Sequence, residues 1–246
     1  KSLVTFNGES ILVDCGLFQG PKNLRIKNWN KLESAEKVKF VVLTHAHIDH
    51  IAGLPLFIDD LFAEIDKPVE VYASNEVIEI LESDVFNWDV YPRFSELENE
   101  HGVVMKYRPF EPGKTFVVEH LEISAISVNH KVPAVGFTVS DGESSFAISG
   151  DTAEMDGFWK TINQEDDFDA LLIECAFPTR LNELAQISHH MTPSRLKNEL
   201  QKFEDKSCPI YVINMKPSYR DEILTELAEL RIENVVPLEI GKEYVW

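Results

Sequence analysis

Short runs of apolar and β-branched residues recur along the chain, separated by polar segments that contain Gly, Pro, Asn or Asp. Runs of about four to eight such residues bounded by turn residues are typical of β-strands. We therefore expect strands over Ser10–Val13, Val38–Leu43, Val69–Tyr72, Thr115–Val118, Leu121–Ser127, Ala134–Val139, Ser145–Ile148, Ala170–Glu174, Ile210–Ile213 and Val235–Leu238.

Between some of these runs, the apolar residues recur every three or four positions, which is the period of an amphipathic helix. This pattern predicts helices over Asn75–Phe86 and Ser218–Leu230. A third helix is predicted over Thr192–Phe203, because a Thr followed by Pro has the form of an N-cap with proline in the first turn. The mixture of strands and helices favours an α/β layered fold with mixed sheets. No segment has the composition of a linker, so we expect one domain over residues 1–246.

Composition and charge narrow the possible functions. The chain has 23 Lys and Arg against 42 Asp and Glu, a formal net charge of −19, which opposes binding to nucleic acid. No apolar run is long enough to cross a membrane. The three cysteines lack the spacing of a disulfide framework, so we expect a reducing, cytoplasmic location. The chain opens with Lys1 in strand-like sequence, which favours a trimmed N-terminal strand.

Imidazole and carboxylate groups are concentrated in the segment Thr44–His50, directly after the predicted strand Val38–Leu43. Three of the eight histidines lie there together with one aspartate. The end of a buried strand is a rigid platform, and the turn that follows can direct alternate side chains into one cleft. Neutral imidazole and carboxylate are donors that suit Zn, Fe or Mn. A solvated polar turn is the alternative interpretation.

His45, His47, Asp49 and His50 form the HxHxDH motif of the metallo-β-lactamase superfamily, and the sequence resembles that superfamily from end to end. The resemblance implies an α/β fold of the metallo-β-lactamase type, a four-layer αββα sandwich with two mixed β-sheets. It also implies that the residues of this motif bind metal.

Three further residues follow the superfamily's motifs in order. Asp14 lies in ILVDCGLFQG, where the family's aspartate supports the metal-binding loop without binding the metal itself. His130 ends Ser-Val-Asn-His, and Asp151 lies in Ser-Gly-Asp-Thr after a predicted strand. The resemblance implies two divalent metal ions, with Zn as the first choice and Mn or Fe as alternatives. The first ion would be bound by His45, His47 and His130, and the second by Asp49 and His50, with Asp151 bridging the two.

Several segments narrow the resemblance to the class II 3′,5′-cyclic-nucleotide phosphodiesterases. The segment Asp84–Phe94 (DVFNWDVYPRF) is similar to their aromatic-rich segment. An aromatic cluster would suit a purine, since every base offers a π face for stacking. Packing of a helix end into the core is the alternative. The candidate substrate-binding residues of this segment are Asn87, Trp88, Tyr91 and Phe94.

Glu174, in LLIECAFP, and His190, in SHHMTP, resemble a Glu and a His-x-Thr-Pro signature that these enzymes share with the tRNA 3′-processing endonucleases. The resemblance implies that His190, backed by Glu174, contacts the phosphate and serves the leaving oxygen. Asp49 is the other candidate proton donor to that oxygen. For His190, a metal ligand and a structural residue at a helix start are the alternatives.

Asn214, in YVINMKP, is a departure from the family pattern, because a His normally completes the second metal site at this position. An amide oxygen is a poorer ligand for Zn than imidazole and is better tolerated by harder cations such as Mn or Mg. Asn214 is therefore a tentative ligand. Three outcomes are open: a weaker second site, a ligand taken from His190, or reduced or lost activity. Lys216 is either a phosphate contact or an ordinary surface lysine.

The resemblance implies a dinuclear metal-dependent phosphodiesterase that hydrolyses 3′,5′-cyclic nucleotides, a small-molecule substrate, to 5′-monophosphates by attack of a metal-bound hydroxide. The alternatives are an RNA-processing nuclease, another ester or thioester hydrolase, and a degenerate domain that binds a nucleotide without turnover. The β-CASP nucleases carry a large inserted domain, for which the 80 positions between His50 and His130 leave no room. No basic arm of the tRNA endonuclease type is present. Analogy with the fold favours a homodimer, and no membrane partner is expected.

Overall fold

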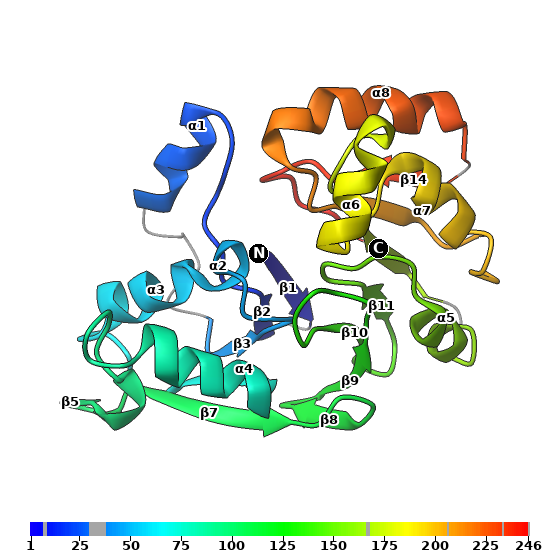
Figure 1. The fold of residues 1–246 in the computed structure, drawn as a ribbon. Helices are drawn as coiled ribbons and strands as arrows, with labels where there is room; N and C mark the ends of the chain where they lie inside the picture. Colours follow the sequence, from blue (N-terminus) through cyan, green and yellow to red (C-terminus); the bar gives the residue numbers. More distant parts are fainter. Residues whose placement is uncertain (7–8, 30–37, 166–167, 206, 233, 246) are drawn as a thin grey trace. The chain divides into compact units, whose positions relative to one another are not determined.

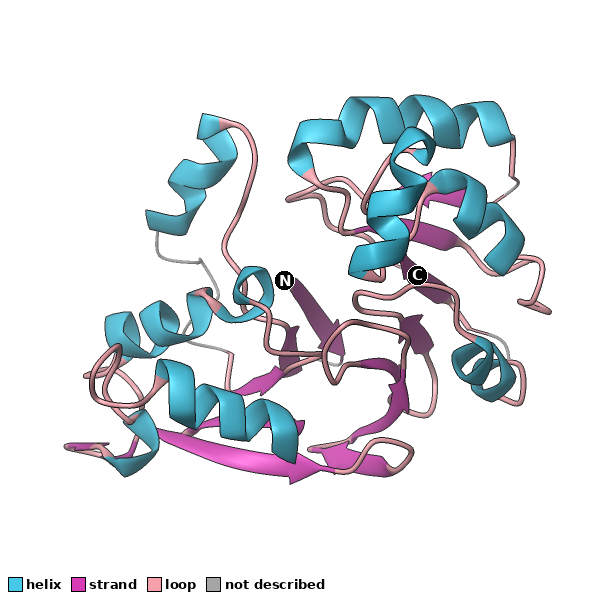
Figure 2. Cartoon of the chain, viewed as in Figure 1, coloured by secondary structure: helices cyan, strands magenta, loops and turns pink. Residues whose placement is uncertain are grey.

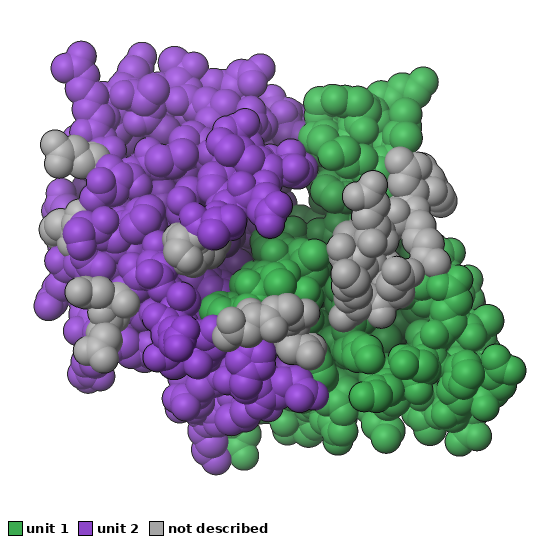
Figure 3. Space-filling view, turned by 180° about the vertical axis from the view of Figure 1, so that it is seen from behind, with its two compact units in different colours: residues 1–111 green, residues 112–246 purple. Residues whose placement is uncertain are grey.

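The computed structural model describes residues 1–6, 9–29, 38–165, 168–205, 207–232 and 234–245 (Figures 1 and 2). The chain folds into two compact units, residues 1–111 and residues 112–246, which are coloured separately in Figure 3. Each unit has its own β-sheet and its own helices. A single domain over the whole chain stays a prediction.

The first unit contains a five-stranded mixed sheet with the strand order β1-β2-β3-β4-β7. β1 and β2 form an antiparallel hairpin, whereas β2, β3, β4 and β7 run parallel to one another. A separate two-stranded ribbon joins β5 to β6. The strands are β1 Ser2–Phe6, β2 Glu9–Val13, β3 Phe40–Val42, β4 Val69–Ser74, β5 Glu98–Asn99, β6 Gly102–Val103 and β7 Met105–Phe110.

The helices α3 and α4 of the first unit pack their apolar residues into the core beside the sheet. Leu54 and Ile58 of α3 and Val77 of α4 are buried in one core with Val41 and Val71 of the sheet. The helices are α1 Lys22–Arg25, which continues as a 3-10 turn over Ile26–Trp29, then α2 Ile48–Ile51, α3 Gly53–Leu61 and α4 Asn75–Ile80, which continues as a π-helical turn over Leu81–Val85, and a 3-10 turn over Phe94–Glu96.

The second unit contains a seven-stranded mixed sheet with the order β14-β13-β12-β11-β10-β9-β8. Its first strands along the chain, β8 to β11, are antiparallel, and β11 to β14 are parallel. The strands are β8 Thr115–Val118, β9 Leu121–Ser127, β10 Val135–Ser140, β11 Ser145–Ile148, β12 Ala170–Glu174, β13 Ile210–Ile213 and β14 Val235–Pro237.

The helices of the second unit bury their apolar residues against this sheet in a core of their own. Trp159 of α5, Leu196 of α7 and Ile223 of α8 are each at most 2 % exposed. The helices are α5 Asp156–Ile162, α6 Asn182–Ser188, α7 Pro193–Glu199 and α8 Arg220–Leu230, with 3-10 turns over Thr179–Leu181 and Pro217–Tyr219. Among the described residues, no helix combines the length and the apolar character that crossing a bilayer requires.

The structure confirms every predicted strand and all three predicted helices, with small shifts of their ends. The helix predicted to Phe86 changes to a π-helical turn after Ile80, and the helix predicted from Thr192 has that residue as its N-cap with Pro193 in the first turn. The sequence indicated a strand-like N-terminus, where β1 lies, and its pattern missed the strands β5, β6 and β7 and the helices α1, α2, α3, α5 and α6. β7 carries Pro109 and exposed charged residues, as an edge strand does, so it lacks a continuous apolar run.

Candidate functional site

The histidine-rich segment lies at the carboxyl end of β3 in the first unit. β2 and β3 run parallel with Val13 opposite Val42, so the chain leaves both strands at the same edge of the sheet. Three histidines are gathered there: the ring centroid of His45 lies 4.8 Å from that of His47 and 4.1 Å from that of His50. His45 and His50 are buried, and His47 and Asp49 are half-buried.

Asp14, the first residue after β2, holds the histidine-rich segment by hydrogen bonds. Its carboxylate accepts hydrogen bonds from the Thr44 amide at 2.8 Å, from the Thr44 hydroxyl at 2.9 Å and from His50 Nδ1 at 2.7 Å. Burial would raise the pKa of Asp14, but attraction and hydrogen bonding to His50 outweigh burial and lower the pKa below its ordinary value. Because the ionised carboxylate only accepts, His50 donates from Nδ1, and a neutral His50 ring therefore has its lone pair on Nε2.

Thr44 transmits the same constraint to His45. The hydroxyl donates its proton to Asp14, so its oxygen accepts from His45 Nδ1 at 2.9 Å. His45 therefore also keeps Nε2 deprotonated, which is the form of imidazole that binds a metal. These hydrogen bonds give a physical basis to the role that the resemblance implies for Asp14, which is to hold the metal-binding loop without binding the metal. Thr44 itself was not predicted, because its role depends on two neighbours and no family motif pointed to it.

The loop after β2 packs so closely on α2 that only glycine fits at position 16. A Cβ atom on Gly16 would lie 1.8 Å from the carbonyl oxygen of Asp49. The adjacent amide of Cys15 donates to the carbonyl of His50 at 2.7 Å. The backbone of the HxHxDH segment is therefore fixed by direct contact with the loop that carries Asp14.

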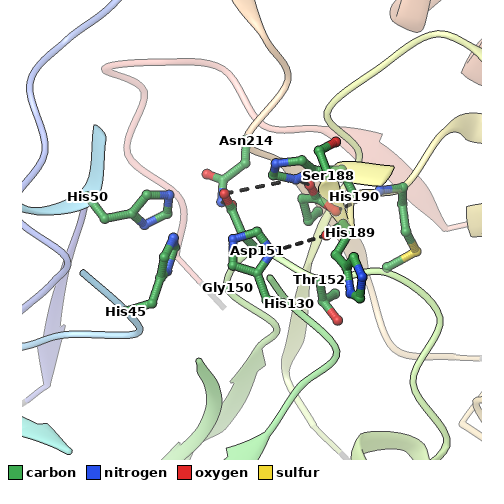
Figure 4. A network of polar contacts seen from close by, with 12 residues as sticks. His45, His50, His130, Gly150, Asp151, Thr152, Ser188, His189, His190 and Asn214 are labelled. Carbon is green, nitrogen blue, oxygen red and sulfur yellow. Dashed lines mark hydrogen bonds and ion pairs between the residues drawn. The ribbon is translucent and has the colours of Figure 1, made fainter. Parts of the chain in front are cut away.

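In the second unit, three predicted site residues lie at the carboxyl ends of the parallel strands β11, β12 and β13: Asp151, Glu174 and Asn214. His130 follows β9, and His190 lies between α6 and α7. Ligand atoms of His130, Asp151 and His190 lie within 4.8 Å of one another (Figure 4). Asp151 and His190 are buried and His130 is half-buried, so the folded chain brings these three donors together.

The orientation of His130 is set by a residue that sequence reasoning did not select. His130 Nδ1 donates to the carbonyl of His189 at 3.1 Å, which leaves Nε2 deprotonated. His189 caps the end of α6 in the left-handed conformation, with φ of 56°. Its ring Nδ1 is hydrogen-bonded to Asn129 Oδ1 at 2.9 Å, and Asn129 Nδ2 donates to the carbonyl of Glu154 at 2.8 Å. These contacts tie the loop of His130 to the loop of His190.

His190 is backed by Glu174, as the resemblance implied. Glu174 is fully buried; one carboxyl oxygen is hydrogen-bonded to His190 Nδ1, and the other accepts from the amide of Met191 at 3.0 Å. Burial, and then repulsion from Asp151, raises the pKa of Glu174 well above its ordinary value. The Glu174–His190 pair can therefore hold a proton between a buried carboxyl group and an imidazole.

Asn214 contacts Asp151 through its amide nitrogen. Nδ2 donates to Asp151 Oδ1 at 2.6 Å, and the residue has φ of 57°. Asn214 thus holds the carboxylate in place by a hydrogen bond, while His190 Nδ1 lies 4.0 Å from Asp151 Oδ2. Lys216 is half-buried, and its charge draws the pKa of Glu174 downward against the larger effects of burial and Asp151.

The aromatic-rich segment of the first unit divides between core and surface. Phe94 is 1 % exposed and packs against Phe86, with ring centroids 5.8 Å apart. It therefore has no surface to offer a substrate, and the core-packing alternative holds for this residue. Asn87 stabilises the turn by accepting from the amides of residues 89 and 90 at 3.0 and 2.8 Å. Trp88 is 54 % exposed, and Tyr91 is packed against the core with part of its surface exposed.

Each unit carries donors that suit a divalent metal ion. The contacts of Thr44, Asp14 and the His189 carbonyl hold three imidazoles in the tautomer that presents Nε2. Asp49 and Asp151 add carboxylates. Neutral imidazole with carboxylate is the donor chemistry that Zn, Fe and Mn prefer, and hydrogen bonds to the second ring nitrogen are the usual support of metal-binding histidines.

Comparisons with known proteins agree with this chemistry. The chain is similar to a probable 3′,5′-cyclic-nucleotide phosphodiesterase of Yersinia pestis, with 25% identity over 225 residues, 79% of this chain and 63% of that protein. It is also similar to ribonuclease J of Mycoplasma genitalium, with 29% identity over 157 residues, 60% of this chain and 24% of that protein. The chain thus spans less than two thirds of the length of these relatives.

The fold has close counterparts among solved structures. The metallo-beta-lactamase fold protein YhfI of Bacillus subtilis superposes with a TM-score of 0.69 at 18% identity, covering 96% of this chain and 87% of that one. This likeness confirms the predicted fold class. The family model described as the beta-lactamase superfamily domain matches residues 9–207, which include every predicted metal ligand except Asn214. The chain therefore belongs to the beta-lactamase superfamily.

Proposed function

We propose that this chain is a metal-dependent phosphodiesterase that hydrolyses 3′,5′-cyclic nucleotides to nucleoside 5′-monophosphates. The observation that carries the proposal is the buried Glu174–His190 pair beside the donors His130 and Asp151. Cleavage of a phosphodiester requires a proton for the departing alkoxide, and an imidazole that shares a proton with a carboxyl group can supply one. The similarity to a probable cyclic-nucleotide phosphodiesterase supports the choice of substrate.

We further propose that this chain binds two divalent ions, with Zn as the first choice and Mn or Fe as alternatives. The ligands would be those that the resemblance implies: His45, His47, Asp49, His50, His130 and Asp151. Bound ions would lower the pKa of water and neutralise the charge that develops on the phosphate. Asp14 and Thr44 keep His50 and His45 in the tautomer that binds metal. Asn214 orients Asp151 through its amide hydrogen bond.

In this proposal His190 donates the proton of its Nε2 to the departing 3′ oxygen. The proton shared with Glu174 moves fully onto Nδ1 at the same time, so the imidazole stays neutral after the transfer. Burial raises the pKa of the Glu174 carboxyl group and so keeps a proton in the pair at neutral pH. The same burial opposes ionisation of Glu174 when that proton moves to Nδ1, and the charge of Lys216 offsets part of this cost. Asp49 is the alternative donor, and in this proposal Lys216 attracts the phosphate.

The proposal is tested by incubating purified protein with 3′,5′-cyclic AMP and either Zn or Mn, and separating the products by chromatography. We expect 5′-AMP rather than 3′-AMP. Asp151→Asn is the control, because it weakens a carboxylate ligand while keeping the shape of the side chain, and we expect it to abolish turnover. Failure of the folded wild-type protein to hydrolyse the substrate with either metal would contradict the proposal.

A second candidate is an RNA-processing nuclease, which the similarity to ribonuclease J favours. The net charge of −19 opposes it, because a protein this acidic repels a polyanionic substrate. End-labelled single-stranded RNA, incubated under the same conditions, separates the two candidates. Cleavage of RNA without hydrolysis of cyclic AMP would favour the nuclease.

A further inference from the structure

Two aromatic side chains lie beside His190 in the second unit, on the loops that follow β12 and β13. The ring centroid of Phe177 lies 5.5 Å from that of His190, with the ring planes at 73°. The ring of Tyr219 lies 6.0 Å from that of Phe177. Both aromatic side chains are half-buried, so each keeps part of its surface accessible. A row of rings therefore starts at the imidazole and leads away from it.

The backbone holds these rings in place. The amides of Ala176 and Phe177 both donate to the carbonyl of Met191, at 3.1 and 3.2 Å. The amide of Lys216 donates to the carbonyl of Ala176 at 3.1 Å, and the amide of Tyr219 donates to the carbonyl of Lys216 at 2.9 Å. The loops of Phe177, His190 and Tyr219 are thus joined to one another, and the spacing of the three rings is fixed by main-chain contacts.

A planar cation packs on one face of the Tyr219 ring. The guanidinium of Arg180 lies over the Tyr219 ring, 5.6 Å from its centroid. Glu222 accepts two hydrogen bonds from this guanidinium, at 2.7 and 3.0 Å, and so fixes its orientation. Guanidinium groups stack on aromatic faces and on planar heterocycles alike. The surface beyond His190 is therefore built of flat groups in defined positions.

We propose that Phe177 and Tyr219 form a platform on which the base of a nucleotide stacks while its phosphate lies at His190. Every nucleobase has a π face, so such a platform selects nucleotides over phosphodiesters that lack a base. This inference rests on the proposed function. It assigns the base-binding role to the second unit, whereas the sequence predicted it for the segment Asp84–Phe94.

The test compares two substrates, 3′,5′-cyclic AMP and a ribose 3′,5′-cyclic phosphate without a base, in Phe177→Leu and Tyr219→Leu. Leucine keeps apolar bulk but removes the flat face. Loss of one stacking contact should raise the KM for cyclic AMP by roughly 5-fold to 150-fold more than the KM for the base-free substrate. The matched control is Tyr211→Leu, because Tyr211 is also half-buried in this unit and its ring pairs with Tyr244 at 5.0 Å.

Equal losses on the two substrates, no change on cyclic AMP, or the same change in Tyr211→Leu would overturn the platform. Binding separates this inference from the proposed function. Calorimetry with the metal-loaded protein compares the binding of 5′-AMP with that of ribose 5-phosphate. We expect the wild-type protein to bind 5′-AMP more tightly, and we expect Phe177→Leu to abolish this preference. If that preference is seen without hydrolysis of cyclic AMP, the proposed function fails and the platform stands. Equal binding of the two ligands by the wild-type protein overturns the platform.

Discussion

Replacement of Glu174 by glutamine tests the proton-carrying pair with little change of shape. The amide of Met191 can only donate, so the carbonyl oxygen of the new glutamine must face it and the NH2 group must face His190 Nδ1. His190 then accepts at Nδ1 and carries its proton on Nε2. That proton can no longer leave, because glutamine has none to pass to Nδ1 in exchange. The same tautomer also prevents Nε2 from binding a metal.

We expect Glu174→Gln to change the free energy of unfolding little and to lower kcat strongly. Glu174→Gln keeps both buried hydrogen-bond partners satisfied, so we expect the free energy of unfolding to change by less than about 1 kcal/mol. Loss of a positioned general acid lowers kcat by roughly 10²-fold to 10⁴-fold. Glu174→Ala, in contrast, leaves the Met191 amide and His190 Nδ1 buried without a partner, at about 1–3 kcal/mol each.

The assay measures kcat for 3′,5′-cyclic AMP together with urea unfolding of the same samples. Glu199→Gln is the matched control, because Glu199 is also a buried glutamate of the second unit, 2 % exposed, that accepts from the Met155 amide and Trp159 Nε1. This control should lose stability through its broken ion pair with Lys202 and keep its activity while folded. If Glu174→Gln retains wild-type kcat, the proton-transfer role of the pair is wrong.

The same variant has an expected dependence on pH. Burial and the charge of Asp151 raise the pKa of Glu174, so the folded, metal-free protein holds this proton more tightly than the unfolded chain does. Its stability therefore falls as the pH rises from the ordinary glutamate pKa towards the folded value. Glu174→Gln lacks this loss, so its stability relative to the wild type should improve across that range. Urea titrations in the presence of a chelator would measure it, and a relative change of the opposite sign would refute the assigned shift.

Three further predictions concern the two units. Asn214→His places an imidazole at a left-handed position that histidine tolerates and should increase the number of Zn ions retained per chain on dialysis; unchanged retention would contradict it. Asn129→Ala frees the loop whose carbonyl orients His130 and should weaken metal binding roughly 10-fold to 100-fold in competition with a chelating dye, and equal affinity would count against that role. All three cysteines are buried, and burial raises the pKa of the Cys15 thiol to about 12, so iodoacetamide should label none of them quickly until urea unfolds the protein.

The sequence could predict most of the fold because its strands are apolar and bounded by turn residues. β11, β12 and β13 are short buried runs, and the structure has them at the predicted residues. Asp151, Glu174 and Asn214 could be selected as candidates because their segments resemble motifs of the superfamily, and the structure has all three at the carboxyl ends of these parallel strands. α5 and α6 have seven residues each, as α7 does, but they begin after Met155 and Leu181 and so lack the Thr-Pro start signal that revealed α7.

The residues that position the candidate ligands could not be predicted in the same way. His130 is oriented by a main-chain carbonyl, and any residue type at position 189 has one. Phe94 was a reasonable substrate contact by its type, but its environment is set by contacts with Phe86 of the same segment and with Phe62, which lies more than 20 positions earlier in the chain. Type and spacing therefore indicate which groups carry chemistry, while the packing decides which of them face a substrate.

Backbone conformation accounts for an asparagine at position 214, as it does for the aspartate at position 14. Asp14 and Asn214 are each the first residue after a parallel strand, β2 and β13, and have φ of 58° and 57°. Asp and Asn adopt this left-handed conformation more readily than most side chains. Each then holds a candidate metal ligand by a short hydrogen bond, Asp14 to His50 at 2.7 Å and Asn214 to Asp151 at 2.6 Å. By this parallel, Asn214 acts as a support that orients a ligand, and the proposed second metal site depends on His50 and Asp151 more than on Asn214.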